Sequence, residues 1–264
     1  METTNPPIEM LPVGEGSDQR GIAIRHRPVA DGSPRPGFFW LGGYRSDMEG
    51  TKAIEIDAHA AVRGTACTRF DYSGHGASGG AFRDGTISRW LEEALAVFDR
   101  HADRPQILIG SSMGAWIALR LVATLRERGE GDRVAGLLLL APAPDFTIDL
   151  MEPALTADQT RDLQQRGFFE EPTPYGPEPN VYTRALFEDG RANRVLDKPI
   201  ETGCPVHIIQ GMADPDVPHT HALKLMECLP ADEVVMTLVR DGDHRLSRPQ
   251  DIARMLRALD GFMA

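Results

Sequence analysis

Ser112 stands at the centre of a Gly-x-Ser-x-Gly pentapeptide that begins at Gly110 and ends at Gly114. An apolar run precedes the pentapeptide and a long helical pattern follows it, so we expect a tight turn from strand to helix. The glycines allow the tight turn, while Ser112 is expected to hold strained backbone angles that expose its hydroxyl. A Gly-Ser pentapeptide also occurs by chance in ordinary loops, and here the flanking strand and helix favour a nucleophile.

A serine hydroxyl is a weak nucleophile near neutral pH, so Ser112 needs a base and a carboxylate that orients this base. Asp214 follows the apolar run 206–210, and His244 follows the run 233–239. The carboxyl ends of parallel strands meet at one edge of a sheet, so we expect Ser112, Asp214 and His244 to lie together. The chemistry would be acyl transfer, with His244 as general base and Asp214 as orienting acid.

Two alternatives concern neighbouring residues. Asp216 could orient the base, but the Asp-x-x-Val-Pro spacing favours Asp214 and makes Asp216 a turn residue. His219 and His221 could suggest a metal pair, but side chains two apart on a helix point to different faces, so we expect no metal. The other histidines are assigned to structural elements or to a glycine-rich loop: His26, His59, His75, His101 and His207.

Acyl transfer also needs hydrogen-bond donors for the oxyanion of the tetrahedral intermediate. The backbone N–H of Met113, directly after the nucleophile, is one expected donor. We place the other at the backbone N–H of Tyr44, because Gly42 and Gly43 before it permit a close approach; a simple turn is the alternative. The glycine-rich segment 71–80 lacks the Lys-Ser/Thr of a phosphate loop, so we interpret it as a structural turn.

Composition excludes several classes of protein. The chain of 264 residues has 39 acidic and 28 basic residues, a net charge of −11 that repels nucleic acid and anionic membranes. The longest apolar run, residues 134–144, has about half the length of a membrane-spanning helix. Three widely spaced cysteines, Cys67, Cys204 and Cys228, indicate reduced thiols and a cytoplasmic protein, and residues 1–10 do not resemble a signal peptide.

The order of elements predicts one α/β domain with a mostly parallel central sheet flanked by helices. Strands are expected at 21–27 and 37–43 as a hairpin, with a turn at 31–36, and then at 67–71, 106–110, 134–141, 206–210 and 233–239. Helices are expected at 51–62, 87–101, 113–128, 219–228 and 249–259. Continuous apolar runs such as 137–140 are typical of strands covered on both faces.

Residues 144–199 break this alternation. The segment is rich in proline, contains helical patterns near 156–166 and 182–189, and has no convincing strand. It is too long for a structureless loop, so we interpret it as a helical cap inserted between core segments 1–143 and 200–264, with a plain surface excursion as the alternative. Its apolar residues could line an acyl pocket or form a small core of its own: Met151, Leu155, Leu163, Phe168, Phe169 and Phe187.

Together these motifs resemble the α/β-hydrolase family. The matching segments are Leu-Gly-Gly-Tyr at 41–44, Asp-Tyr-Ser-Gly-His-Gly-Ala-Ser at 71–78, Gly-Ser-Ser-Met-Gly at 110–114, Gly-Met-Ala-Asp-Pro-Asp-Val-Pro at 211–218 and Asp-His-Arg at 243–245. Gly-Thr-Lys-Ala at 50–53 and Arg-Phe-Asp-Tyr-Ser-Gly at 69–74 are similar to the branch of α/β-hydrolase domain-containing protein 10. That resemblance implies a thioesterase acting on protein S-acyl groups or an acyl-glucuronide esterase. The absence of an Arg-rich presequence suggests a bacterial-type cytoplasmic relative.

The sequence therefore predicts a serine hydrolase of carboxylic esters or thioesters that needs no cofactor. Its partner would be a small acyl ester or thioester, or an S-acylated protein, without nucleic acid or stable membrane insertion. The same three residues could also cleave amide, lactone or carbon–carbon bonds. A hydrolase fold that serves as a ligand receptor is the alternative of another class, because fold alone does not establish function.

Overall fold

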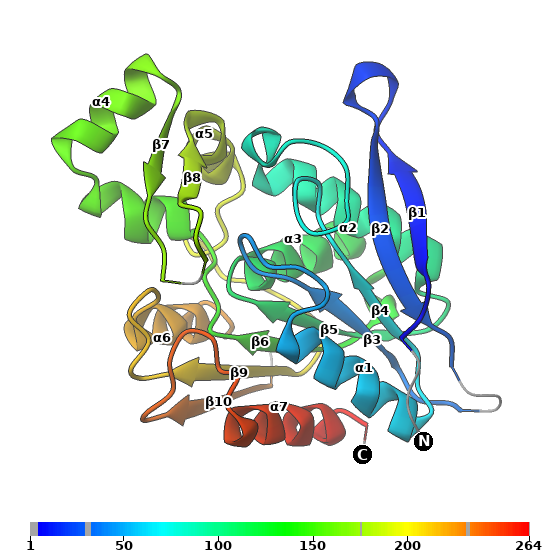
Figure 1. Cartoon of the computed structure of the whole chain (residues 1–264). Helices are drawn as coiled ribbons and strands as arrows, with labels where there is room; N and C mark the ends of the chain where they lie inside the picture. Colours follow the sequence, from blue (N-terminus) through cyan, green and yellow to red (C-terminus); the bar gives the residue numbers. More distant parts are fainter. Residues whose placement is uncertain (1–4, 30–32, 175, 231–232, 264) are drawn as a thin grey trace.

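The computed structural model describes residues 5–29, 33–174, 176–230 and 233–263. Within these residues, eight strands form one sheet in the order β1-β2-β4-β3-β5-β6-β9-β10 (Figure 1). β2 runs antiparallel to both of its neighbours, and all other neighbouring pairs are parallel. The strands are β1 (Ile8–Val13), β2 (Arg20–Arg27), β3 (Gly37–Leu41), β4 (Cys67–Phe70), β5 (Gln106–Ser111), β6 (Val134–Leu140), β9 (Val206–Gly211) and β10 (Val234–Val239).

Helices cover both faces of the sheet, as Figure 1 shows. Side chains of α1 (Thr51–Arg63) and α7 (Pro249–Gly261) pack on one face, and those of α2 (Ile87–His101), α3 (Met113–Glu127) and α6 (His219–Glu227) pack on the other. Successive side chains of a strand point to opposite faces of the sheet and so pack against both helix layers. In β5, Ile107 and Ile109 face α1 and α7, while Leu108 faces the other layer. Short 3₁₀ turns lie at Gly16–Asp18, Phe82–Asp84 and Gly131–Arg133.

The expected helices and parallel strands are confirmed, with bounds that differ by at most a few residues. The expected hairpin of strands 21–27 and 37–43 is wrong, because β4 lies between β2 and β3 in the sheet. Turn residues indicate where a chain reverses, but not which strands then pair. The predicted turn 31–36 falls partly on residues 31 and 32, which lie outside the described residues.

β1 is a strand that the sequence pattern did not reveal. It pairs antiparallel with β2 along the edge of the sheet, with Pro12 opposite Gly21. Proline has no backbone N–H to donate to a neighbouring strand, so it is tolerated at an edge. Its presence also argues against a strand when only the sequence is considered.

The segment 144–199 is inserted between β6 and β9 and lies above the carboxyl ends of the strands in Figure 1. It contains a π-helical turn (Thr147–Met151), a 3₁₀ turn (Glu152–Ala154), α4 (Ala157–Gln165) and α5 (Arg184–Ala192). The expectation of no strand in it is wrong: β7 (Phe168–Glu171) and β8 (Asn180–Thr183) form an antiparallel pair. Each strand has four residues and a proline-rich link joins them, so neither shows a clear period of two.

The apolar residues of this segment mostly pack into the protein. Phe169 and Phe187 are buried in the main hydrophobic cluster, and Met151, Leu155 and Leu163 pack against it. Phe168 instead contacts the guanidinium groups of Arg83 and Arg166, which lie 3.9 and 4.6 Å from its ring centroid. Within the described residues no helix combines the length and the apolar character that a membrane crossing needs.

Candidate active site

Ser112 occupies a strained turn between β5 and α3. Its backbone angles are φ 54° and ψ −119°, a positive φ that non-glycine residues rarely adopt. The flanking glycines are required by close backbone approach: a Cβ on Gly110 would lie 2.6 Å from Ala115 Cα, and one on Gly114 would lie 2.0 Å from the Leu41 carbonyl oxygen. The turn thus packs directly against the end of β3.

Ser112, His244 and Asp214 form a hydrogen-bonded chain. His244 Nε2 lies 3.0 Å from Ser112 Oγ, and His244 Nδ1 lies 2.8 Å from Asp214 Oδ2. His244 Nδ1–H donates a hydrogen bond to the ionised Asp214, which leaves Nε2 without a proton as the acceptor for the Ser112 hydroxyl. The structure therefore brings together three residues that the sequence places 30 and 132 positions apart.

The surroundings of Asp214 keep its carboxylate ionised. The side chain is fully buried, which by itself would raise its pKa, but the hydrogen bond and charge of His244, together with the backbone hydrogen bonds from Val217 and Asp216, lower the pKa below the ordinary value. The backbone N–H groups of Asp216 and Val217 donate to Oδ1, at 2.8 and 2.9 Å, and the Gln210 amide donates to Oδ2 at 3.2 Å. Asp216 itself is exposed and forms part of the turn that holds Asp214.

Asp214, Asp216 and His244 have potential metal-ligating atoms within 4.8 Å of one another. Both oxygens of Asp214 already accept hydrogen bonds from the protein, and His244 Nδ1 is engaged with one of them. A cation would have to displace these contacts, so the donor set fits a hydrogen-bonded acid and base better than a metal centre.

The loop after β3 lies directly against the serine turn. A Cβ on Gly43 would lie 3.3 Å from Ser112 Cβ and 3.2 Å from the Ser111 carbonyl oxygen, so only glycine fits without displacement. Within the described residues, no protein acceptor is hydrogen-bonded to the backbone N–H of Tyr44 or of Met113. Two unengaged amides thus lie on the two segments that meet at Ser112.

His75 is a component of this region that the sequence did not single out. Its Nε2 accepts the backbone N–H of Arg45 at 3.1 Å, and its Nδ1 donates to the Ser73 carbonyl oxygen at 3.1 Å. Burial lowers the pKa of the imidazole to about 4, so it stays neutral and keeps an acceptor for Arg45. The two residues are 30 positions apart in the sequence, and no local sequence pattern predicts their contact.

The loop that contains His75 is a structural turn, as the sequence indicated. The Asp71 carboxylate accepts the backbone N–H groups of Met48 and Ala77, at 2.6 and 2.8 Å. A Cβ on Gly76 would lie 2.1 Å from this carboxylate. The glycine-rich loop therefore closes on its own acid, which leaves no cradle for a phosphate.

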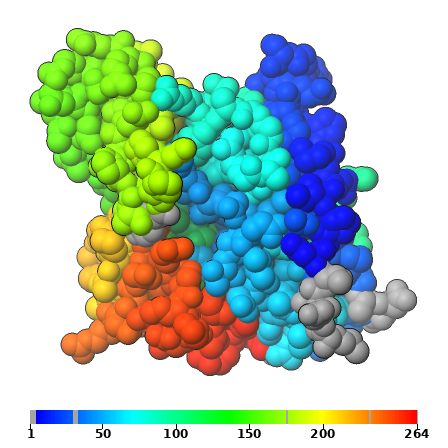
Figure 2. Space-filling view, in the orientation of Figure 1, coloured from blue at the N-terminus to red at the C-terminus, as the bar shows by residue number. Residues whose placement is uncertain are grey.

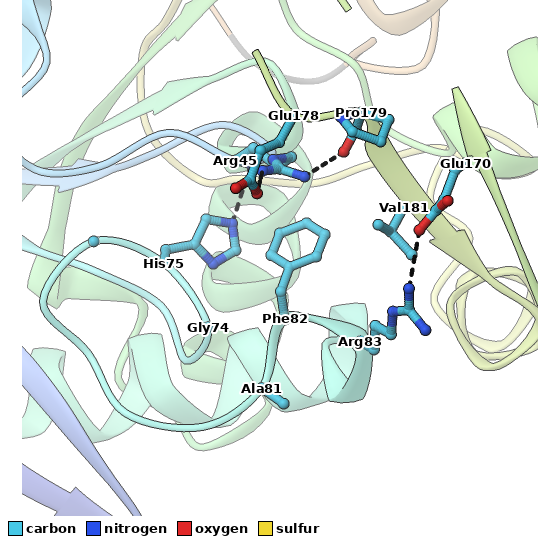
Figure 3. Close-up of a pocket in the computed structure, with 11 residues that line it drawn as sticks. Arg45, Gly74, His75, Ala81, Phe82, Arg83, Glu170, Glu178, Pro179 and Val181 are labelled. Atoms are coloured by element: carbon cyan, nitrogen blue, oxygen red, sulfur yellow. Dashed lines mark hydrogen bonds and ion pairs between the residues drawn. The ribbon is translucent and has the colours of Figure 1, made fainter. Parts of the chain in front are cut away.

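A cavity of about 540 Å³ lies between the core and the inserted segment (Figure 3). Arg45, His75 and Phe82 line its core side, and residues of the inserted segment line the other side, including Glu170 and Val181. Ser112, Asp214 and His244 are not among its lining residues; Arg45, which lines it, lies two residues after Gly43, whose backbone packs against Ser112. Figure 2 shows the surface hollowed between the yellow-green inserted segment, the orange C-terminal segment and the blue-cyan half of the core.

Two ion pairs join the core to the inserted segment across this cavity. The Arg83 guanidinium lies 3.0 Å from Glu170, and the Arg45 guanidinium lies 3.4 Å from Glu178. Figure 3 shows Arg83 and Glu170 facing one another from opposite walls. The cavity is therefore lined by charges of both signs as well as by apolar groups.

The mostly parallel sheet, with a serine on the turn after β5 and a histidine after β10, defines an α/β hydrolase. The chain belongs to this family, because residues 32–255 match the model of the "Alpha/beta hydrolase family". Over 230 residues it is 31% identical to the mitochondrial palmitoyl-protein thioesterase ABHD10 of Homo sapiens, a match that covers 86% of this chain and 73% of that protein.

Solved structures agree with this assignment. A bacterial protein from Agrobacterium vitis S4, described only as a candidate hydrolase, is 62% identical with a TM-score of 0.94, covering 98% of this chain and 100% of that one. Mouse α/β hydrolase domain-containing protein 10 is 27% identical with a TM-score of 0.83, covering 97% of both chains. Est1E of Butyrivibrio proteoclasticus, at 19% identity, a TM-score of 0.74 and coverage of 96% and 97%, shares the fold. The α/β-hydrolase fold expected from the sequence is confirmed.

Proposed function

We propose that the protein is a serine hydrolase of carboxylic esters or thioesters that works through a Ser-His-Asp triad. His244 accepts the Ser112 proton as Oγ attacks the acyl carbon, and Asp214 stabilises the imidazolium that forms. The leaving group departs with the proton from His244. Water then attacks the acyl-enzyme with the same histidine as base, which releases the acid and restores Ser112.

The observation that carries this proposal is the hydrogen-bonded chain at 3.0 and 2.8 Å, on a serine held at positive φ. The geometry matches that of a nucleophile, a base and an orienting acid. The unengaged backbone N–H groups of Met113 and Tyr44 are the proposed oxyanion donors. Their position on the two segments that flank Ser112 supports that role.

We propose an acyl thioester or ester as the substrate, and this class includes S-acylated proteins. The relationship to ABHD10, described as a palmitoyl-protein thioesterase, supports this class. The cavity beside the loop 43–45 has a charged lining, with Arg45, Arg83, Glu170 and Glu178, and this lining suits a polar leaving group better than an alkyl chain.

The test is hydrolysis of a chain-length series of acyl groups, each presented as an oxygen ester and as a thioester. Ser112→Ala should lose at least about 10³-fold in rate on an activated ester, because it removes the attacking atom. Ser111→Ala is the matched control, since Ser111 is the neighbouring serine and lies outside the hydrogen-bonded chain. Equal turnover by Ser112→Ala, or failure of a fluorophosphonate to modify Ser112 in the folded protein, would contradict the proposal.

A further inference from the structure

The ammonium group of Lys52 lies at the N-terminal end of α1, where a positive charge is unfavourable. Lys52 is the second residue of α1, whose first turn contains no acidic side chain. The N-terminal end of a helix carries partial positive charge, so a cation there is destabilising. Only three of the 28 basic residues of the chain are lysines.

No ion pair compensates for the unfavourable interaction between the Lys52 ammonium and the N-terminal end of the helix. The side chain of Lys52 is partly buried, and within the described residues no carboxylate oxygen lies within 4.0 Å of Nζ. Burial and the nearby charge of Arg245 lower the pKa of the ammonium to about 8, while the charges of Asp243, Asp214 and Asp251 oppose that shift. A partly buried cation without a contacting anion is unfavourable, so a specific contact is expected to retain it.

That contact is with the loop that carries His244. Lys52 Nζ donates a hydrogen bond to the backbone carbonyl oxygen of Arg245, the residue directly after His244. The same oxygen accepts the Ser247 hydroxyl at 2.9 Å, and the Leu246 N–H donates to the Asp243 carboxylate at 3.0 Å. These last two bonds lie within the loop, whereas the bond from Lys52 ties the loop to α1.

α1 follows the loop that contains Tyr44. The hydrogen bond from Lys52 therefore joins the segment of a proposed oxyanion donor to the segment of the proposed base. We propose that Lys52 is a positioning residue, whose charged hydrogen bond to the Arg245 carbonyl holds His244 in line with Ser112; this inference rests on the proposed function.

The experiment compares the wild type with Lys52→Met, which keeps the length of the side chain and removes its charge and its donors. Lys198→Met is the matched control, because Lys198 is exposed and lies outside the site. Fluorophosphonate titration counts the competent sites, and the rate of an activated ester per site gives kcat from pH 6.5 to 9.5. Ser112→Ala supplies the background at each pH.

We expect Lys52→Met to lose about tenfold in kcat at pH 7, while its free energy of unfolding is unchanged or increased because a partly buried charge at a helix N-terminus is gone. The ratio of the wild-type rate to the Lys52→Met rate should fall as pH rises through about 8, because the wild-type ammonium loses its charge and becomes a weaker donor. Lys198→Met should match the wild type throughout.

A ratio near one, or a ratio above one that does not change with pH, would overturn the positioning role. So would a kcat loss that is fully explained by unfolding. Each of these results leaves the proposed function intact if Ser112→Ala remains inactive. If Ser112→Ala is active, the proposed function itself fails.

Discussion

The rings of Tyr44 and Tyr182 stack almost parallel, with an interplanar angle of 8° and centroids 5.2 Å apart. Tyr44 belongs to the loop after β3, and Tyr182 belongs to β8 of the inserted segment. The Tyr44 hydroxyl also donates to the backbone carbonyl oxygen of Val181. One side chain thus fixes the inserted hairpin to the loop whose backbone lies against Ser112.

Tyr44→Phe should separate the proposed role of the Tyr44 backbone from that of its side chain. The variant keeps the ring stack and the backbone N–H and loses only the hydrogen bond to Val181. We expect a loss of about 1 kcal/mol in the free energy of unfolding, measured by urea denaturation, and a kcat within about threefold of the wild type. Tyr44→Ala, which also removes the ring, should cost about 3–5 kcal/mol. A kcat loss of about 10²-fold or more in Tyr44→Phe would instead implicate the phenol in catalysis.

Asp214→Asn, compared with Asp216→Asn, should show which of these two carboxylates orients His244. An amide at position 214 cannot stabilise the imidazolium and favours the wrong tautomer of His244, so kcat should fall by about 10³- to 10⁴-fold. Asp216→Asn should stay within about threefold, because it keeps the backbone N–H that Asp216 donates to Asp214 Oδ1. Steady-state rates on one activated ester measure both variants. The opposite ranking would transfer the role of orienting acid to Asp216.

The parts of the fold that the sequence predicts are those with a local cause. β5 and β6 are buried on both faces and read as apolar runs, and α2 has a clear apolar stripe and a Thr86 side chain that caps its first turn. The Gly110 and Gly114 spacing predicts the strained turn, because only glycine tolerates the contacts found there. The positions of Ser112, Asp214 and His244 follow from the rule that parallel strands end at one edge.

The parts that the sequence does not predict depend on contacts between distant segments. The placement of β4 between β2 and β3 is a choice among strand partners that turn residues do not specify. The hydrogen bond between His75 and Arg45, and the tether from Lys52 to Arg245, join residues that no spacing rule relates. The hairpin β7–β8 is stabilised by packing of Phe169 and Tyr182 into the core, so it forms although its two strands are joined by a proline-rich link.

His75 should make the protein less stable in mild acid. The pKa of its buried imidazole is about 4 in the folded state, below the ordinary value of 6.5, so the unfolded chain binds a proton between these pH values and the folded protein does not. The contribution of His75 to the free energy of unfolding is therefore fully present above pH 6.5 and decreases as the pH falls toward 4. The total decrease is about 3 kcal/mol. His75→Gln keeps an acceptor for the Arg45 N–H and does not titrate, so its unfolding free energy, measured by urea denaturation from pH 7 to pH 4, should fall less steeply. Other buried histidines, such as His221, titrate in both proteins and cancel in the difference. Parallel curves for the two proteins would mean that His75 is protonated as readily in the folded state as in the unfolded chain.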